Sequence, residues 1–461
     1  MKIQSFYNHS PYALRVLAVS LTGIFYRHRR YGKNIEDLVT EVLARDFWTE
    51  EQWKIWQENR LEEILNMAAT MVPYYKIFWD NKRRKGDKSS WTYLENWPIL
   101  KKEDLRKTPK AFLMEKKKYE FLMEEHTSGS TGTPLTMWRS RKTDQIWYAQ
   151  FEARVRRWND ISFTDRWAIF GGKLVAPIQQ DSHPFWVWNA GLNQLYLSSY
   201  HISKKNVKHY IDAINKHKIT YILGYPSALS LLASISLDLE LSLPPIKIVI
   251  TNAEMLLPHQ KNTIQKAFNC RVVNTYGMSE IVAAGSECLF STMHQWSDTG
   301  FVENLQLDTN EQVNVGESGR LICTGLINES MPLIRYEIGD WATRVSKTKC
   351  ECGRNLPELH NLEGRLDDIL ITPDGRHIGR MDPIFKANLP IKEVQIIQEK
   401  VNFISVKVVA GDDYDLKTRQ IISDLIQERM GNVEIKIEEV TEIAREKNGK
   451  LKSVISKIKS P

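Results

Sequence analysis

Between residues 166 and 274, short apolar runs alternate with longer amphipathic stretches. The apolar runs occupy residues 166–170, 221–225, 247–251 and 271–274, and the stretches between them include 204–217 and 257–268. Strands that alternate with helices are typical of βαβ units, because parallel strands need a crossover connection that usually carries a helix. We therefore predict an α/β fold with mostly parallel sheets, in which ligands bind at the carboxyl ends of the strands.

Polar motifs follow three of these predicted strands. They are Gly224-Tyr225-Pro226-Ser227, then Thr251-Asn252-Ala253-Glu254, then Asn274-Thr275-Tyr276-Gly277-Met278-Ser279-Glu280. The carboxyl ends of parallel strands meet at one edge of a sheet, so the three motifs are expected to contribute to one site.

A run of small residues precedes this region: Thr127-Ser128-Gly129-Ser130-Thr131-Gly132-Thr133-Pro134. Glycines allow successive backbone N–H groups to point at one position, and the hydroxyls add donors, so the run suits phosphate oxygens. A surface linker has a similar composition and stays open as an alternative. No lysine follows the glycines as it does in a Walker loop, which excludes a GTPase-like or kinase-like P-loop.

Composition limits the remaining choices only broadly. The 461 residues, 42% hydrophobic and 26% charged, are those of a globular protein with more than one domain. The net charge of +7 fits an anionic substrate or a membrane surface as well as nucleic acid, and does not discriminate among them. Five cysteines and no secretory signal pattern favour a reducing cytoplasm, where thiols bind metal or lie buried.

The two ends of the chain differ in their sequence patterns. Residues 13–26 are apolar and precede Arg27-His28-Arg29-Arg30, but they are fewer than the ~20 residues that span a bilayer. We predict an amphipathic helix packed on the body, with a membrane-surface helix as the alternative. Beyond Gly364, predicted strands at 394–399, 403–409 and 433–440 and a helix at 416–430 indicate a compact α+β domain.

Taken in order, these motifs resemble those of the adenylate-forming superfamily, the acyl-CoA synthetases and their relatives. Within it the chain looks most like the branch that contains phenylacetate–CoA ligase and capsule-biosynthesis adenylate ligases. The resemblance covers residues 124–457 and implies an enzyme that activates a carboxylic acid as acyl-AMP, with release of pyrophosphate. The acyl group then passes to CoA or to an amine, and surface polysaccharide biosynthesis is one setting that the resemblance suggests.

The same resemblance implies a domain plan. Residues 1–122 form a helical segment packed on the large domain, 123–364 the rest of the large AMP-binding domain, and 365–461 a small mobile α+β domain. ATP and Mg²⁺ are the implied cofactors.

Residue roles follow from the resemblance as well. The loop from Thr127 wraps the ATP phosphates, although Leu135 stands where the family has lysine. Tyr276 stacks on adenine, Glu280 binds Mg²⁺, and Asp340 of Arg335-Tyr336-Glu337-Ile338-Gly339-Asp340 accepts the ribose hydroxyls. The implied nucleotide-binding residues are Thr127, Ser128, Gly129, Ser130, Thr131, Gly132, Asn252, Ala253, Glu254, Asn274, Tyr276, Gly277, Met278, Ser279, Asp340 and Arg365.

Two further positions concern the C-terminal domain. Asp367 matches the hinge between the two domains, and Lys450 matches the lysine that contacts the substrate carboxylate and the α-phosphate during adenylation. A lysine on a swinging domain can bring a point charge to developing negative charge and then leave. Lys450, Glu280 and Asp367 are therefore the predicted catalytic residues.

Cys288, His294, Cys350 and Cys352 form a second constellation. Three cysteines and one histidine suit a closed tetrahedral Zn²⁺ site, which would be structural rather than catalytic. Members of the branch carry a similar pattern. Buried free thiols or an oxidisable pair are the alternatives, and Cys270 and Cys323 are predicted to lie in the core.

The expected partners are small molecules: a carboxylic acid and an acyl acceptor, with no nucleic acid. We predict that the acyl pocket draws on residues 170–173, 189–200 and 224–227, with Trp186 and Trp188 beside it. An adenylation-inactive binding or scaffolding protein of the same fold is the alternative function. A membrane-surface transferase is a further alternative, suggested by the N-terminal helix.

Overall fold

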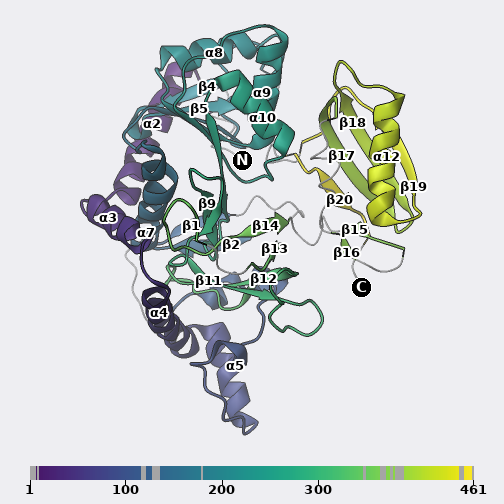
Figure 1. Ribbon diagram of the computed structural model, residues 1–461. Helices are drawn as coiled ribbons and strands as arrows, with labels where there is room; N and C mark the ends of the chain where they lie inside the picture. Colours follow the sequence, from purple (N-terminus) through teal and green to yellow (C-terminus); the bar gives the residue numbers. More distant parts are fainter. Residues whose placement is uncertain are drawn as a thin grey trace.

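A computed structural model describes residues 7, 10–115, 121–126, 135–177, 180–345, 349–363, 370–373, 377–378, 389–445 and 451–458. Figure 1 shows a large N-terminal region beside a smaller C-terminal domain. The predicted phosphate loop at 127–134, Arg365, Asp367 and Lys450 lie outside the described residues.

An eight-stranded sheet in the order β10-β9-β8-β7-β6-β3-β5-β4 forms the centre of the large region. Its parallel strands are β3 (Trp167–Gly171), β5 (Gln194–Ser198), β6 (Tyr221–Gly224), β7 (Ile248–Thr251) and β8 (Arg271–Gly277). The strands β4 (Trp186–Asn189), β9 (Ala284–Glu287) and β10 (Met293–Gln295) are antiparallel additions at the two edges. The prediction of an α/β fold with a mostly parallel sheet is confirmed.

Helices cover both faces of this sheet, because its strands are apolar on both sides. Ile222 packs into a core with α8 (Val207–Lys216), α9 (Pro226–Asp238) and α10 (Pro258–Phe268). Tyr221 and Leu223, the residues on either side of it, pack into the opposite core. That second core contains Val155, which follows α7 (Arg141–Phe151) in the chain.

The helix α7 gives way to irregular turns at its C-terminal end. It begins at Arg141, after Ser140, whose Oγ accepts a hydrogen bond from the backbone N–H of Thr143 (3.1 Å). After Phe151 it continues as a π-helical turn, η3 (Glu152–Arg156), and a 3₁₀ turn, η4 (Arg157–Asn159). Arg154 in the π turn is fully buried between Asp46 and Asp298, an arrangement that apolar periodicity could not reveal.

A second sheet lies below the first in Figure 1 and is antiparallel, in the order β11-β12-β13-β14. Its strands are Gly300–Leu305, Ser318–Gly325, Tyr336–Thr343 and His360–Glu363. It shares a core with α4 (Glu50–Met71), α5 (Pro73–Arg84) and α6 (Lys102–Lys107). The hairpin of β1 (Met123–His126) and β2 (Thr136–Arg139) adds Met137 to the same core.

The N-terminal helix α2 (Tyr12–Arg30) lies on β4, α7 and the 3₁₀ turn η5 (Ala190–Leu192). The approach is close at two glycines, and at Gly191 it involves backbone atoms, so that position requires glycine. A Cβ on Gly23 would lie 1.8 Å from the Asn189 Oδ1, and one on Gly191 would lie 2.3 Å from the Ile24 nitrogen. One face of this helix thus packs on the large region. The next helix, α3 (Ile35–Arg45), packs on α7 and η3.

The C-terminal domain contains a four-stranded sheet in the order β19-β18-β17-β20. The strands are β17 (Ile391–Lys400), β18 (Phe403–Ala410), β19 (Glu434–Glu439) and β20 (Val454–Ser456), with a short hairpin of β15 (Leu370–Ile371) and β16 (His377–Ile378) before them. The helix α12 (Leu416–Met430) packs on the sheet through Ile422, Ile426 and Met430. It ends where Gly431 adopts a φ of 76°, which glycine allows at little cost.

Candidate active site

The three predicted strand-end motifs lie side by side. In the parallel register, Gly224 of β6 pairs with Thr251 of β7, which in turn pairs with Asn274 of β8. Thr251 Oγ1 donates to Asn274 Oδ1 (2.9 Å), and Thr275 Oγ1 donates to the Thr251 carbonyl (2.8 Å). These hydrogen bonds join the carboxyl ends of the strands into one edge.

Asn252 offers an acceptor at this edge. Its backbone N–H donates to the Gly224 carbonyl (3.1 Å), which fixes the residue between β6 and β7. Its Oδ1 is buried and has no hydrogen-bond partner among the described atoms. A buried acceptor of this kind costs about 1–3 kcal/mol unless a donor reaches it. Asn252 therefore suits a ligand that brings an N–H group.

Glu254 accepts hydrogen bonds from two parts of the protein. Its carboxylate accepts hydrogen bonds from the Ser227 N–H and Oγ (both 3.0 Å) and from the Leu451 N–H (2.7 Å). Burial raises the pKa of Glu254, and these hydrogen bonds oppose that effect. Ala253 before it adopts a φ of 67° and is exposed. Glu254 thus connects the N-terminal turn of α9 to the C-terminal domain, and its assignment to the nucleotide stays a prediction.

The end of β8 also contacts the antiparallel sheet. Tyr276 Oη donates to Asp340 Oδ2 (2.7 Å), and Tyr336 Oη donates to Glu280 Oε1 (3.2 Å). Burial raises the pKa of the Tyr276 phenol well above its usual range, and the Asp340 carboxylate adds to the effect. The phenol is therefore a stable donor. An aromatic ring and two carboxylates meet here, a set that suits a purine nucleoside and a hard cation.

The other predicted residues of this motif differ in burial. Met278 packs against the core of the antiparallel sheet, whereas Gly277 and Ser279 are exposed. Tyr336 and Leu451 contact predicted site residues but were not themselves predicted, and Ser227 was predicted only for the acyl pocket. Ser227 and Tyr336 lie inside motifs that the sequence singled out, whereas nothing local to Leu451 marks it.

Three tyrosines from the residues predicted for the acyl pocket lie together, and their assignment to an acyl group stays a prediction. The Gly172 N–H donates to Tyr225 Oη (3.1 Å), the Lys173 N–H donates to Tyr196 Oη (3.0 Å), and Tyr200 Oη donates to the Gly172 carbonyl (3.0 Å). Burial raises the pKa of Tyr225 to about 12. The three phenols surround the carboxyl end of β3, next to the site edge.

The part of that prediction that covers residues 189–193 is wrong. Strand β4 is antiparallel to β5, so Asn189 pairs with Gln194 at the start of β5. Asn189 and Asn193 therefore lie at the opposite edge of the sheet from the site. Asn189 Oδ1 accepts from the Leu192 N–H (3.3 Å), and Trp188 stacks on His217. These side chains belong to the packing of α2 and α8.

The cysteine and histidine constellation forms one cluster. The potential ligand atoms of Cys288, His294, Cys350 and Cys352 all lie within 4.8 Å of one another. Cys288 and Cys350 approach to 3.6 Å between sulfurs, and Cys352 Sγ lies 3.2 Å from His294 Nε2. Nδ1 of the same histidine lies 3.3 Å from the Leu356 carbonyl, a contact that directs Nε2 to the thiols. The donor set fits a closed tetrahedral Zn²⁺ site.

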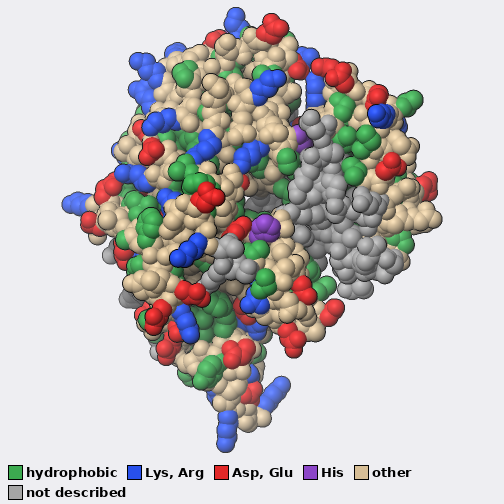
Figure 2. All heavy atoms as spheres, viewed as in Figure 1, with side chains coloured by type: hydrophobic (Ala, Val, Ile, Leu, Met, Phe, Trp, Pro, Cys, Tyr) green, Lys and Arg blue, Asp and Glu red, His purple; other side chains and the backbone are tan. Residues whose placement is uncertain are grey.

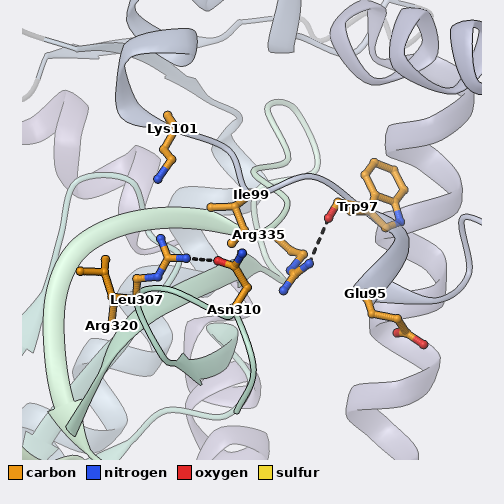
Figure 3. Close-up of a pocket in the computed structure, with 8 residues that line it drawn as sticks. All are labelled: Glu95, Trp97, Ile99, Lys101, Leu307, Asn310, Arg320 and Arg335. Carbon is orange, nitrogen blue, oxygen red and sulfur yellow. Dashed lines mark hydrogen bonds between the residues drawn. The ribbon is translucent and has the colours of Figure 1, made fainter. Parts of the chain in front are cut away.

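A cavity of about 660 Å³ lies elsewhere in the large region and is shown in Figure 3. It is lined by Glu95, Trp97, Ile99, Lys101, Leu307, Asn310, Arg320 and Arg335, none of which is a predicted site residue. Its cations are already paired, since Lys101 and Arg320 contact Glu337 (2.6 and 2.5 Å) and Arg335 contacts Glu303 (2.9 Å). We therefore place the candidate active site at the strand edge and not in this cavity.

Comparison with known proteins identifies the family of this chain. Residues 83–326, more than half of the chain, match the model of the family described as AMP-binding enzyme. This chain belongs to the AMP-binding enzyme family. Residues 370–457 of this AMP-binding enzyme also match the CapK C-terminal domain. It is an adenylate-forming ligase of the branch that the motifs indicated.

Individual relatives support the same assignment. The enzyme is 28% identical to Protein CapK of Staphylococcus aureus, over 98% of this chain and 99% of that protein. It is 26% identical to the phenylacetate-coenzyme A ligase of Thermus thermophilus, over 70% of this chain and 72% of that protein. Its fold matches that of 2-hydroxyisobutyryl-CoA ligase in the postadenylation state, with a TM-score of 0.67 and 19% identity over 89% of this chain and 91% of the other.

Proposed function

We propose that this enzyme activates a carboxylic acid with ATP, giving acyl-AMP and pyrophosphate, and then transfers the acyl group to CoA or to an amine. The observation that carries the proposal is the meeting of Tyr276, Asp340 and Glu280 at the edge where β6, β7 and β8 end. Family membership supplies the use of ATP.

The nucleotide is assigned to the strand edge. The Tyr276 ring offers a face for adenine, and the buried Asn252 Oδ1 offers an acceptor for the exocyclic amino group. Asp340, held by the Tyr276 phenol, accepts the ribose hydroxyls. Arg365 and the loop Thr127–Gly132 are assigned to the ribose and phosphates by resemblance alone. Two strands flank that loop: β1 ends at His126 before it, and β2 begins at Thr136 after it.

Mg²⁺ is assigned to Glu280. Its carboxylate is a hard oxygen ligand, which Mg²⁺ prefers, and the Tyr336 phenol orients it. When bound, the cation would neutralise charge on the phosphates and on the departing pyrophosphate.

The first reaction is an in-line displacement. A carboxylate oxygen of the acid forms a bond to the α-phosphorus, and the bond from that phosphorus to the pyrophosphate oxygen breaks. The attacking carboxylate and the leaving pyrophosphate are both anions. The protein therefore contributes the positioning of these groups and the stabilisation of their charge. Lys450 is assigned to the negative charge that develops at the α-phosphate.

In the second reaction a thiol or an amine attacks the acyl carbonyl, and AMP leaves with the electrons of the broken C–O bond. Phenylacetate-coenzyme A ligases are among the relatives, which favours CoA as the acceptor. Resemblance to capsule-biosynthesis adenylate ligases extends the proposal to surface polysaccharide biosynthesis, and the match to Protein CapK over the whole chain is consistent with that extension.

A zinc ion in the Cys288–His294–Cys350–Cys352 cluster completes the proposal. Asn274 at the site edge donates its N–H to Glu287 (2.9 Å), and Glu287 is the residue before Cys288. The metal cluster would therefore stabilise the position of the strand that carries the site. Its role would be structural, because a closed site leaves no position for substrate.

Pyrophosphate release across a panel of carboxylic acids tests the function. We expect release that depends on both ATP and one class of acid, and a second screen with CoA, amino acids and amino sugars then identifies the acceptor. ATP binding without acid-dependent release across the panel would favour the alternative, a binding or scaffolding protein of the same fold.

A further inference from the structure

The helix α2 presents an apolar face to solvent. We define the outer stripe as Leu14, Leu17, Leu21, Ile24 and Phe25, whose exposed fractions are 52, 55, 59, 57 and 47%, together with Phe121 (57%). Their spacing along the helix places them on one face. Phe121 joins the stripe from another segment, since its ring meets that of Phe25 edge-on with centroids 6.4 Å apart.

The helix that carries the stripe is fixed to the body. The Ala190 N–H donates to Ser20 Oγ (3.1 Å), and Arg29 contacts Asp144 and donates to the Arg139 carbonyl (2.8 Å). With the close approach of Gly23 to Asn189, these contacts hold the inner face against β4, η5 and α7. The outer stripe is therefore a permanent surface and not the face of a detached segment.

The N-terminal segment that carries the helical part of the stripe is basic. Residues 1–35 contain six Lys and Arg and no Asp or Glu. Arg27 and His28 are exposed in the last turn of α2, and Arg30 lies over the rings of Tyr26 and Tyr148. In Figure 2, Lys and Arg side chains are numerous along the edge of the molecule where Figure 1 draws α2 and α8.

We propose that the outer stripe of α2 docks this enzyme on the surface of a bilayer that contains anionic lipid. An interfacial helix inserts an apolar face of this size below the headgroups and keeps its basic residues among the phosphates. No described helix has the length and apolarity to cross a bilayer, so the contact is peripheral. A second copy of the chain fits less well, because an antiparallel α2 would offer no carboxylate to the basic residues.

The test is co-sedimentation with vesicles of phosphatidylglycerol and phosphatidylcholine, beside vesicles of phosphatidylcholine alone. We expect the full chain to bind the anionic vesicles, and less so as salt is raised, since exposed charges are screened. The double variant L17S/L21S should lose at least about tenfold in binding, because it removes two inserting leucines. Both positions are exposed, so the substitutions leave no cavity.

A matched control makes the same change elsewhere. L239S/L416S alters two exposed leucines, on α9's C-terminal side and at the start of α12, and should bind as wild type does. Acid-dependent pyrophosphate release without vesicles should persist in both variants, which separates failure of this proposal from failure of the proposed function. Absence of vesicle binding, equal binding by L17S/L21S, or equal binding to neutral vesicles would overturn the proposal. So would a lipid-free dimer, seen by light scattering, that L17S/L21S abolishes.

Discussion

The phenol of Tyr276 donates a 2.7 Å hydrogen bond to the carboxylate of Asp340, 64 residues further along the chain. Tyr276 is the penultimate residue of β8 in the mostly parallel sheet, and Asp340 lies within β13 of the antiparallel sheet. A second hydrogen bond crosses in the other direction, from Tyr336 of β13 to Glu280 beyond β8. The two sheets are thus joined at the point where the nucleotide is proposed to bind.

The Tyr276 to Asp340 hydrogen bond predicts a graded effect of substitution. Tyr276→Phe keeps the ring and removes the donor to a charged acceptor, a change worth about 1.5–3 kcal/mol. We expect KM for ATP to rise roughly 10–100-fold in an ATP–pyrophosphate exchange assay. Tyr276→Ala should cost more, since it also removes the ring. Tyr93→Phe, at an exposed tyrosine, is the control, and equal exchange by Tyr276→Phe and wild type would contradict the role of the phenol.

Glu280 is expected to be essential for turnover and dispensable for folding. Glu280→Gln retains a similar shape and an acceptor for Tyr336 but loses the charge that Mg²⁺ requires. We expect acid-dependent pyrophosphate release to fall by at least about 100-fold with an unchanged melting temperature. Glu317→Gln, at an exposed glutamate, should have no effect on release. Release at the wild-type rate by Glu280→Gln would rule out this magnesium ligand.

Much of the fold could be predicted because local patterns and tertiary packing agree. The helix predicted at 416–430 coincides with α12, since Asp415 caps its start (2.7 Å to the Thr418 N–H) and Gly431 ends it. Strands β6 and β7 were predicted within a residue of their bounds, because each is a buried apolar run between turn residues.

The remainder depends on partners that are distant in sequence. Strand β4 could not be oriented from its own residues, since its antiparallel pairing with β5 is set by the turn between them. Buried ion pairs such as Arg154 with Asp46 and Asp298 leave no periodic signal. At the site, each motif could be placed at a strand end, but the hydrogen bond from Leu451 to Glu254 joins residues 197 apart and depends on how two domains meet.

The metal cluster predicts zinc that stabilises the protein. We expect about one Zn²⁺ per chain in purified enzyme, measured by atomic emission. Cys288→Ser should release the metal and lower the melting temperature by roughly 5 °C or more, because a structural site contributes folding free energy. Cys270→Ser removes a cysteine outside the cluster and should retain the zinc. Metal-free protein with reduced thiols would refute the assignment.

Two contacts join the C-terminal domain to the large region. Leu451, the residue after Lys450, donates its N–H to Glu254 in the turn after β7. Lys392 and Asp238 pair across the same boundary (3.0 Å). This arrangement brings the end of the C-terminal domain to the strand edge, as adenylation would require of Lys450.

If Lys450 acts on the α-phosphate and the domain then turns about Asp367, the lysine should matter in one half-reaction only. Losing a preorganised charge at the transition state costs on the order of 10²–10³ in rate. Lys450→Ala should therefore nearly abolish acyl-AMP formation but still convert supplied acyl-AMP with the true acceptor. Asp367→Pro restricts rotation by fixing φ, and should retain adenylation better than transfer. Lys457→Ala, at a nearby exposed lysine paired with Glu399, should alter neither step. Equal slowing of both half-reactions by Lys450→Ala would show that this lysine is a binding or structural residue, and that no domain rotation separates the two steps.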